Sequence, residues 1–354
     1  MDYNKIVQGI LDIGEAMLQS GAENFRLEDS FYRMCRSYGF KRSDVFVIPS
    51  NIQVTVETPE GEIITQIRHI ESSEPNFDQL DYLNNLCRYV CQHTPDENEM
   101  REKYLEVINR EPQKRITRYA AGIMGGTGFA VFFGCNLWDA VIAFIVSVMI
   151  VAVGDWLAKR ESNLLVYNGI LAFISEVIII GALKMGIADH PDRIMIGIVM
   201  LLISGLSTTN GIRDLLQRDF ISGFINIMNS FLGAAGIAFG IGLAIILFHE
   251  GYSDHFILNH SVPIQLISCT VACTGFAFWF KIRGKQVWYN SIGAFFTWAI
   301  YVAVYAVKPS NFLATMIAAG FVGFYAFIMS RYHRAPATIF LTTSILPVVP
   351  GANL

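Results

Sequence analysis

The sequence predicts a polytopic all-α membrane protein with two inverted five-span repeats, preceded by a small cytoplasmic α+β domain. Three observations lead to this prediction: an apolar composition, a change in charge density near residue 116, and a similarity between two stretches of the apolar part. The 354 residues are 53% hydrophobic and only 16% charged, with a mean hydropathy of +0.42. This composition excludes a soluble enzyme of the whole length.

Charge divides the chain at about residue 116. Residues 1–116 hold 13 Lys and Arg against 20 Asp and Glu, whereas residues 117–354 hold 13 against 10. The first stretch suits a soluble domain, and the second suits helices in lipid. No basic and apolar leader opens the chain, so we expect residues 1–116 to stay in the cytoplasm.

The soluble domain is predicted to have the element order ααβββαα. Apolar spacing indicates helices over 4–19 and 24–38, then 77–93 and 96–109, with Asp96 near an N-cap. Three β-branched runs between them predict strands over 44–49, 52–58 and 62–70. Arg26 and Glu28 stand at a helix start, where they form a ligand or partner contact or, as we prefer, a surface salt bridge.

No metal site, cofactor site or enzyme motif is predicted. The six cysteines lack nearby metal-ligand partners at suitable spacing and are interpreted as free thiols. His249, His255 and His260 are irregularly spaced and are interpreted as loop residues. No Ser/His/Asp set or phosphate loop occurs, so we expect a protein that is not an enzyme.

Apolar runs after residue 116 predict nine membrane spans, because about 20 helical residues cross the hydrocarbon core. The spans lie near 117–134, 138–157, 164–184, 193–211, 221–248, 262–280, 288–306, 311–330 and 335–350. With the N-terminus inside, ten of the 13 Lys and Arg after residue 116 fall at inner ends, and Lys184, Arg193 and Lys308 fall outside. The bias predicts a cytoplasmic N-terminus.

Two stretches of the membrane part resemble each other. Thr127-Gly128-Phe129-Ala130 matches Thr274-Gly275-Phe276-Ala277, at an offset of 147 residues, and residues 201–205 align with 347–351. This predicts five-span repeats over 117–248 and 262–354, the second incomplete with four spans. Five is odd, so the repeats are inverted, as in many secondary transporters with a substrate site at the repeat interface.

Two acidic residues within predicted spans are proton-coupling candidates, because ionisable groups in lipid are costly. Glu176 lies near the middle of its span, where apolar surroundings let a carboxyl group hold a proton near neutral pH; a structural hydrogen bond is the alternative. Asp155 lies near the inner end of its span. There an ion pair with Lys159 at i,i+4 is the preferred interpretation.

The candidate substrate site consists of two segments that interrupt predicted helices, 205–211 and 347–351. Small and hydroxylated residues beside glycine release backbone groups for a polar solute, and proline breaks a helix. Asn226 and Asn229 in the fifth span add amides suited to a carboxylate or zwitterion, whereas its glycines allow close helix packing. The predicted substrate-binding residues are Thr208, Thr209, Asn210, Arg213, Asn226, Asn229, Pro350, Gly351 and Asn353.

The segments GAENFRLEDSFYRMCRSYGF, GIRDLLQRDFISG and LPVVPGANL, in this order behind an α+β domain, resemble the threonine/serine exporter family. The resemblance covers essentially the whole chain. It implies export of a small polar metabolite driven by the proton-motive force, with threonine or serine as the first expectation. Members occur as one fused protein of ten spans or as two chains, and a two-chain relative is linked to dicarboxylate export. A tenth span is therefore expected after the ninth, 335–350, and the sequence up to Leu354 does not contain it.

Together these features predict a secondary transporter in the cytoplasmic (inner) membrane that works by alternating access and proton antiport. Its expected partners are protons, the lipid bilayer and a small-molecule substrate, either an amino acid or a dicarboxylate. No nucleic-acid partner is expected. Glycine-rich spans also allow a homo-oligomer. The alternatives are a dicarboxylate exporter, or a membrane sensor or enzyme acting through the N-terminal domain.

Overall fold

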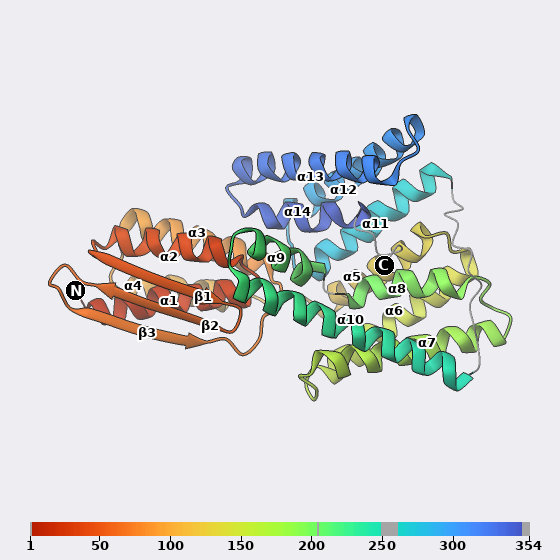
Figure 1. Cartoon of the computed structure of the whole chain (residues 1–354), viewed down its shortest axis with the longest axis horizontal. Helices are drawn as coiled ribbons and strands as arrows, with labels where there is room; N and C mark the ends of the chain where they lie inside the picture. Colours follow the sequence, from red (N-terminus) through yellow and green to blue (C-terminus); the bar gives the residue numbers. More distant parts are fainter. Residues whose placement is uncertain (1, 204, 249–260, 349–354) are drawn as a thin grey trace. The chain divides into compact units, whose positions relative to one another are not determined.

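The computed structural model describes residues 2–203, 205–248 and 261–348, which form two compact units. The first unit contains residues up to 112 with 208–227 and 334–336, and the second contains the rest. Figure 1 labels the elements of both units. Each unit is described separately below.

The first unit joins four helices to a small antiparallel sheet. Its strands β1 (Arg42–Ile48), β2 (Asn51–Glu57) and β3 (Ile63–His69) pair in the order β1-β2-β3. Its helices are α1 (Tyr3–Gln19), α2 (Asn24–Ser37), α3 (Phe77–His93) and α4 (Glu97–Ile108). The order ααβββαα is the one that the sequence predicts.

Alternation in β2 shows which face of the sheet is covered. Ile52, Val54 and Val56 are buried, together with Phe31 of α2, whereas the residues between them are more accessible. Side chains of a strand alternate between faces, so one face packs on the helices and the other is accessible. Asp96 accepts hydrogen bonds from the amides of Asn98 and Glu99 and thus caps α4.

Most of α9 (Gly205–Leu216) and the first two turns of α10 (Phe220–Phe248) group with this first unit, which the sequence does not predict. The two helices touch at glycines. A Cβ atom on Gly211 would lie 3.0 Å from the carbonyl oxygen of Gly223, so a larger residue at 211 has no room. A polar segment expected in the membrane part therefore belongs to the unit that contains the sheet.

The second unit is all helical. Its helices before α10 are α5 (Arg115–Phe132), α6 (Leu137–Leu157), α7 (Leu164–Lys184) and α8 (Pro191–Leu202). After residue 260 follow α11 (Val262–Trp279), α12 (Lys285–Val307), α13 (Asn311–His333), α14 (Ala337–Ile345) and the 3₁₀ helix η1 (Leu346–Val348). Helix α5 packs against α6, α8 and α11.

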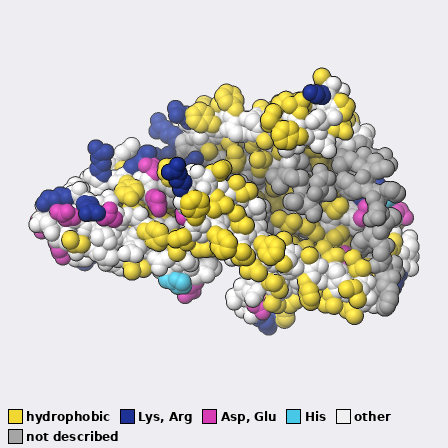
Figure 2. Space-filling view, in the orientation of Figure 1, with side chains coloured by type: hydrophobic (Ala, Val, Ile, Leu, Met, Phe, Trp, Pro, Cys, Tyr) yellow, Lys and Arg dark blue, Asp and Glu magenta, His cyan; other side chains and the backbone are white. Residues whose placement is uncertain are grey.

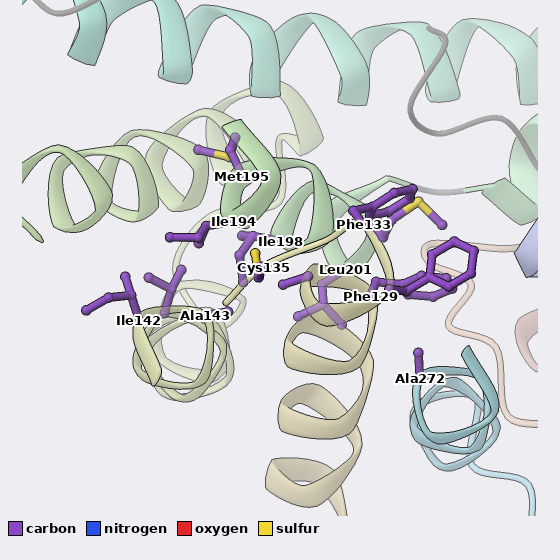
Figure 3. Packing of buried hydrophobic residues seen from close by; sticks show 14 of the residues in the cluster. Phe129, Phe133, Cys135, Ile142, Ala143, Ile194, Met195, Ile198, Leu201 and Ala272 are labelled. Carbon is purple, nitrogen blue, oxygen red and sulfur yellow. The ribbon is translucent and has the colours of Figure 1, made fainter. Parts of the chain in front are cut away.

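Phe129 of α5 lies in the core of this unit. Around it gather Ile198 and Leu201 of α8 and Ala272 of α11, with Ile142 of α6 in the same cluster (Figure 3). On the face seen in Figure 2, hydrophobic side chains also cover much of the second unit, whereas charged side chains gather over the N-terminal elements. Exposed apolar surface of this extent is typical of helices that face lipid.

Within the described residues, six helices are long and apolar enough to cross a membrane: α6, α7, α10, α11, α12 and α13. The α8 and α9 pair would make a seventh as one broken span. Helices also occupy the other two of the nine predicted positions. However, α5 carries Arg115, Arg118 and four glycines, and α14 is short. The chain is a polytopic membrane protein, with fewer clear spans than the sequence predicts.

The second-unit helices recur at a nearly constant spacing. Helices α11, α12, α13 and α14 begin 147, 148, 147 and 146 residues after α5, α6, α7 and α8, respectively. The first pair is in direct contact. A Cβ atom on Gly128 would lie 2.9 Å from Ala272, and one on Gly275 would lie 2.5 Å from the amide nitrogen of Gly125.

Candidate functional site

Glu176 is fully buried near the middle of α7, twelve residues after Leu164 and eight before Lys184. Among the described residues, neither carboxylate oxygen has a hydrogen-bond partner. Burying a charged carboxylate without a partner destabilises the folded protein by roughly several kcal/mol. Such a group is therefore retained for a function or held in its neutral form. The proton-coupling prediction for Glu176 falls on a side chain with this property.

Helix α7 is fixed in place by close packing on α10. The amide nitrogen of the Asn168 side chain donates to the carbonyl oxygen of Gly233 at 3.2 Å. A Cβ atom on Gly240 would lie 2.3 Å from the carbonyl oxygen of Gly169, so the backbones touch there. The predicted packing role of the α10 glycines is confirmed for Gly233, Gly236 and Gly240, whereas Gly242 has open space.

A second buried acid, Asp139 at the start of α6, contrasts with Glu176. Its carboxylate accepts hydrogen bonds from the backbone amides of Asp189 and His190 at 2.9 and 3.2 Å and from the backbone amide of Asn136 at 3.1 Å. A fourth bond joins it to His190 Nδ1 at 2.9 Å. Asp139 therefore ties the loop before α8 to the N-terminus of α6. Its role is structural.

Asp155 does not pair with Lys159 as the i,i+4 spacing predicts. Its carboxylate lies 2.9 Å from a guanidinium nitrogen of Arg118 in α5. The reason is that α6 ends at Leu157, so the helical geometry that would bring residues 155 and 159 together stops between them. Asp155 links two helices near a helix end, and its proton-coupling role stays a prediction.

Arg213, a predicted carboxylate-binding residue in α9, is occupied by an acidic side chain. Its Nη1 lies 2.6 Å from Oε1 of Glu23, the residue before α2, and Oε2 of Glu23 lies 3.3 Å from Nε of Arg26. Both side chains of the Arg213 pair are mostly buried. The predicted salt bridge of Arg26 is thereby identified as one with Glu23.

The remaining predicted substrate residues are dispersed. Asn226 of α10 donates to the carboxylate of Asp214 at 3.0 Å in the first unit, whereas Asn229 is exposed and belongs to the second. Thr208 and Thr209 are exposed, and Asn210 is half-buried. Pro350, Gly351 and Asn353 lie outside the described residues, as do His249, His255 and His260.

Glu28, one turn after Glu23, lies in an electrostatically unfavourable place. Burial raises the pKa of its carboxyl group, the backbone hydrogen bond from Val47 opposes this, and the negative charge of Asp219 raises the pKa further. Asp219 follows α9, so Glu28 and Glu23 of the GAENFRLED segment both face the GIRDLLQRD segment.

Sequence reasoning missed several buried polar groups in the helices after residue 260. Asn290 of α12 and Thr343 of α14 are fully buried, and Asn290 Oδ1 and Thr343 Oγ1 lack hydrogen-bond partners among the described residues. Ser344 Oγ donates to the carbonyl oxygen of Asn290 at 3.4 Å, so the two helices meet there. Such residues are common in apolar helices, and no motif sets them apart.

The described residues hold no group of three or more His, Cys, Asp or Glu side chains placed to bind a metal ion. The ionisable groups singled out above are the buried carboxyl group of Glu176 and the guanidinium group of Arg213, which lies against Glu23.

Two family models match the chain. The model described as "Putative threonine/serine exporter" matches residues 8–248, and that described as "Threonine/Serine exporter, ThrE" matches residues 265–354. The first match ends at the last residue of α10, and the second begins within the first turn of α11.

Two curated relatives carry related names. The "Threonine/serine exporter" of Corynebacterium glutamicum is 23% identical over 356 residues, covering 96% of this chain and 72% of that protein. The "Probable threonine/serine exporter" of Mycobacterium tuberculosis is 22% identical, covering 98% of this chain and 68% of that protein. No solved structure matches the chain. The first family model alone covers more than half of the sequence, so this chain belongs to the threonine/serine exporter family.

Proposed function

We propose that this protein exports threonine and serine across the cytoplasmic membrane by proton antiport. The names of the relatives support the substrate class. The observation that carries the coupling mechanism is the carboxyl group of Glu176 in the middle of α7, which is fully buried and has no hydrogen-bond partner among the described residues. A carrier needs a group that holds a proton in one state and releases it in another, and a carboxyl group without a structural hydrogen bond suits this role.

In the proposed cycle, Glu176 binds a proton from the outer side while the carrier faces outward, and the neutral side chain is compatible with its apolar surroundings. When the carrier faces inward, Glu176 releases this proton to the cytoplasm and the substrate binds. The carrier then returns outward with the substrate. One proton enters for each amino acid that leaves, so an inward proton gradient drives export.

The contact between α5 and α11 supports inverted repeats. Gly128 lies against Ala272 and Gly125 against Gly275, so the partner number falls by three as the residue number rises by three. The helices therefore run antiparallel. Each residue of α5 in these contacts has its equivalent in α11 at an offset of 147 residues. Replacing every residue by its equivalent turns one contact into the other, which is the effect of a two-fold axis perpendicular to both helices. Phe129 and Phe276, also 147 apart, meet at 5.6 Å.

Such an axis lies in the plane of the membrane when α5 and α11 cross it, which is the symmetry of inverted repeats. Alternating access then follows from two similar halves that exchange arrangements around this crossing. The excess of Lys and Arg at one set of span ends favours a cytoplasmic N-terminus.

The test is solute counterflow in proteoliposomes, with and without an inward proton gradient, using labelled threonine, serine and succinate. We expect saturable threonine and serine efflux that the gradient accelerates. Efflux of succinate alone would replace the amino-acid assignment by a dicarboxylate exporter. No gradient-responsive exchange from a folded preparation would contradict the proposal.

A further inference from the structure

We propose that Glu23 is a built-in competitor for the substrate carboxylate, which it imitates by occupying Arg213 in the absence of substrate. This inference rests on the proposed function and assigns the recognition of the carboxylate to Arg213. It gives the unit that contains the sheet a direct part in substrate binding. Nothing in the sequence places these two residues together.

The pair is a single close ion-pair contact, in which the buried Nη1 atom of Arg213 makes no hydrogen bond among the described residues. Glu23 Oε1 lies 2.6 Å from Arg213 Nη1, with 12% of the Glu23 side chain and 27% of the Arg213 side chain exposed. The pair lies within one compact unit, because residues 208–227 group with the residues up to 112. A free amino acid presents the same carboxylate group to the same guanidinium, so one can replace the other without a change in chemistry.

Glu23 also has a second partner to keep when it leaves Arg213. Its other oxygen, Oε2, lies 3.3 Å from Nε of Arg26, three residues along in α2. Displacement of Glu23 by a substrate therefore leaves no isolated buried charge on Glu23, which would cost several kcal/mol by itself. The carboxylate stays paired on α2 while Arg213 pairs with the substrate.

The position of Arg213 links this exchange to transport. Arg213 lies in α9, the helix that follows the break after α8, and its neighbour Asp214 accepts a bond from Asn226 in α10. Glu23 thus holds the segment that connects two parts of the membrane region. Substrate binding at Arg213 releases this hold and lets α9 move in the transport cycle.

The test is the concentration dependence of threonine efflux for the full chain and for the Glu23→Gln variant. Glutamine keeps the size of the side chain but removes its charge and weakens its competition. We expect the half-saturating threonine concentration to fall about three- to fivefold, the range that loss of a partly exposed ion pair allows, with an unchanged maximal rate. A purely structural pair predicts the opposite sign or a lower maximal rate.

A matched control is Asp29→Asn, which removes the 2.8 Å ion pair between Asp29 and Arg33 on the same helix. This pair does not involve α9, so threonine affinity should stay as in the wild type. Threonine amide, which lacks the carboxylate, provides a control on the ligand: its inhibition of efflux should be the same in the wild type and in Glu23→Gln.

If Glu23→Gln lowers the melting temperature, Glu23→Asp and direct binding of labelled threonine to the detergent-solubilised full chain replace the transport assay. An unchanged or weaker threonine affinity in a folded Glu23→Gln variant would overturn the inference, while efflux by the wild type would leave the proposed function standing. Absence of efflux from the wild type would instead contradict the proposed function itself.

Discussion

Asp139 and Glu176 are both completely buried acids of adjacent membrane helices, yet their surroundings are opposite. Asp139 accepts four hydrogen bonds, two of them from backbone amides of the loop before α8. Neither oxygen of Glu176 accepts any from the described residues. The comparison shows that burial alone does not mark a functional acid. We expect the hydrogen bonds that a buried acid receives to separate a structural role from a role in proton transfer.

The largest expected effect on activity is that of Glu176→Gln. Loss of the titratable group should reduce gradient-driven threonine efflux to background, because no proton can exchange with substrate at this position. The melting temperature of the variant should equal or exceed that of the wild type, since Glu176 has no hydrogen bond to the described residues that the substitution would remove. Efflux that still follows the proton gradient would remove Glu176 from the proton path.

The largest expected effect on stability is that of Asp139→Ala. It removes two hydrogen bonds that the carboxylate accepts from the partly buried amides of Asp189 and His190, which costs about 2–5 kcal/mol in total. Thermal unfolding of the purified protein measures this loss. Efflux by the fraction that remains folded should still respond to pH. Loss of that response would show that Asp139, like Glu176, takes part in proton coupling, and would contradict the comparison.

Glycine packing offers a smaller test, of the contact between α10 and α7, the helix that carries Glu176. In Gly240→Ala the new Cβ atom would collide with the carbonyl oxygen of Gly169, at a cost of about 1–3 kcal/mol. Gly320→Ala in α13 is the matched control, because its Cβ meets nothing within 4 Å and no loss of stability is expected. Equal melting temperatures for both variants would show that α7 does not need its contact with α10.

Glu28 supplies the smallest effect and a comparison outside the membrane. Its pKa is raised in the folded protein, so the folded state binds more protons than the unfolded state above pH 4.5, the ordinary value of the group. Its contribution to the free energy of unfolding should therefore fall as pH rises from 4.5 through the raised pKa. Melting temperatures of wild type and Glu28→Gln across this range should converge at low pH. A difference that grows toward low pH would contradict this sign.

Local structure could be predicted from the sequence because it depends on neighbouring residues. The strands, the helix cap at Asp96 and the positions of the membrane helices follow from hydrophobic periodicity and turn residues. The partner of Asp155 was predicted wrongly, because the i,i+4 rule presumes a helix that continues past Leu157. Fewer of the nine predicted spans are clear in the described residues where glycine and arginine reduce hydropathy, as in α5.

Contacts between distant segments were out of reach of the sequence. Glu23 and Arg213 are 190 residues apart, and their pairing depends on the grouping of α9 with the N-terminal elements. Glu176 could be predicted as a candidate from its apolar neighbours, but whether any described residue bonds to its carboxyl group depends on the helices around it. A single sequence records neither property.

The most direct test of the coupling role of Glu176 is proton movement driven by threonine itself. Proteoliposomes loaded with threonine and a trapped pH indicator, without an imposed proton gradient, are diluted into threonine-free buffer. Threonine efflux through the wild type should draw protons inward and acidify the lumen, whereas Glu176→Gln should show no acidification above that of empty liposomes. Equal acidification by both proteins would contradict the assignment of the transported proton to Glu176.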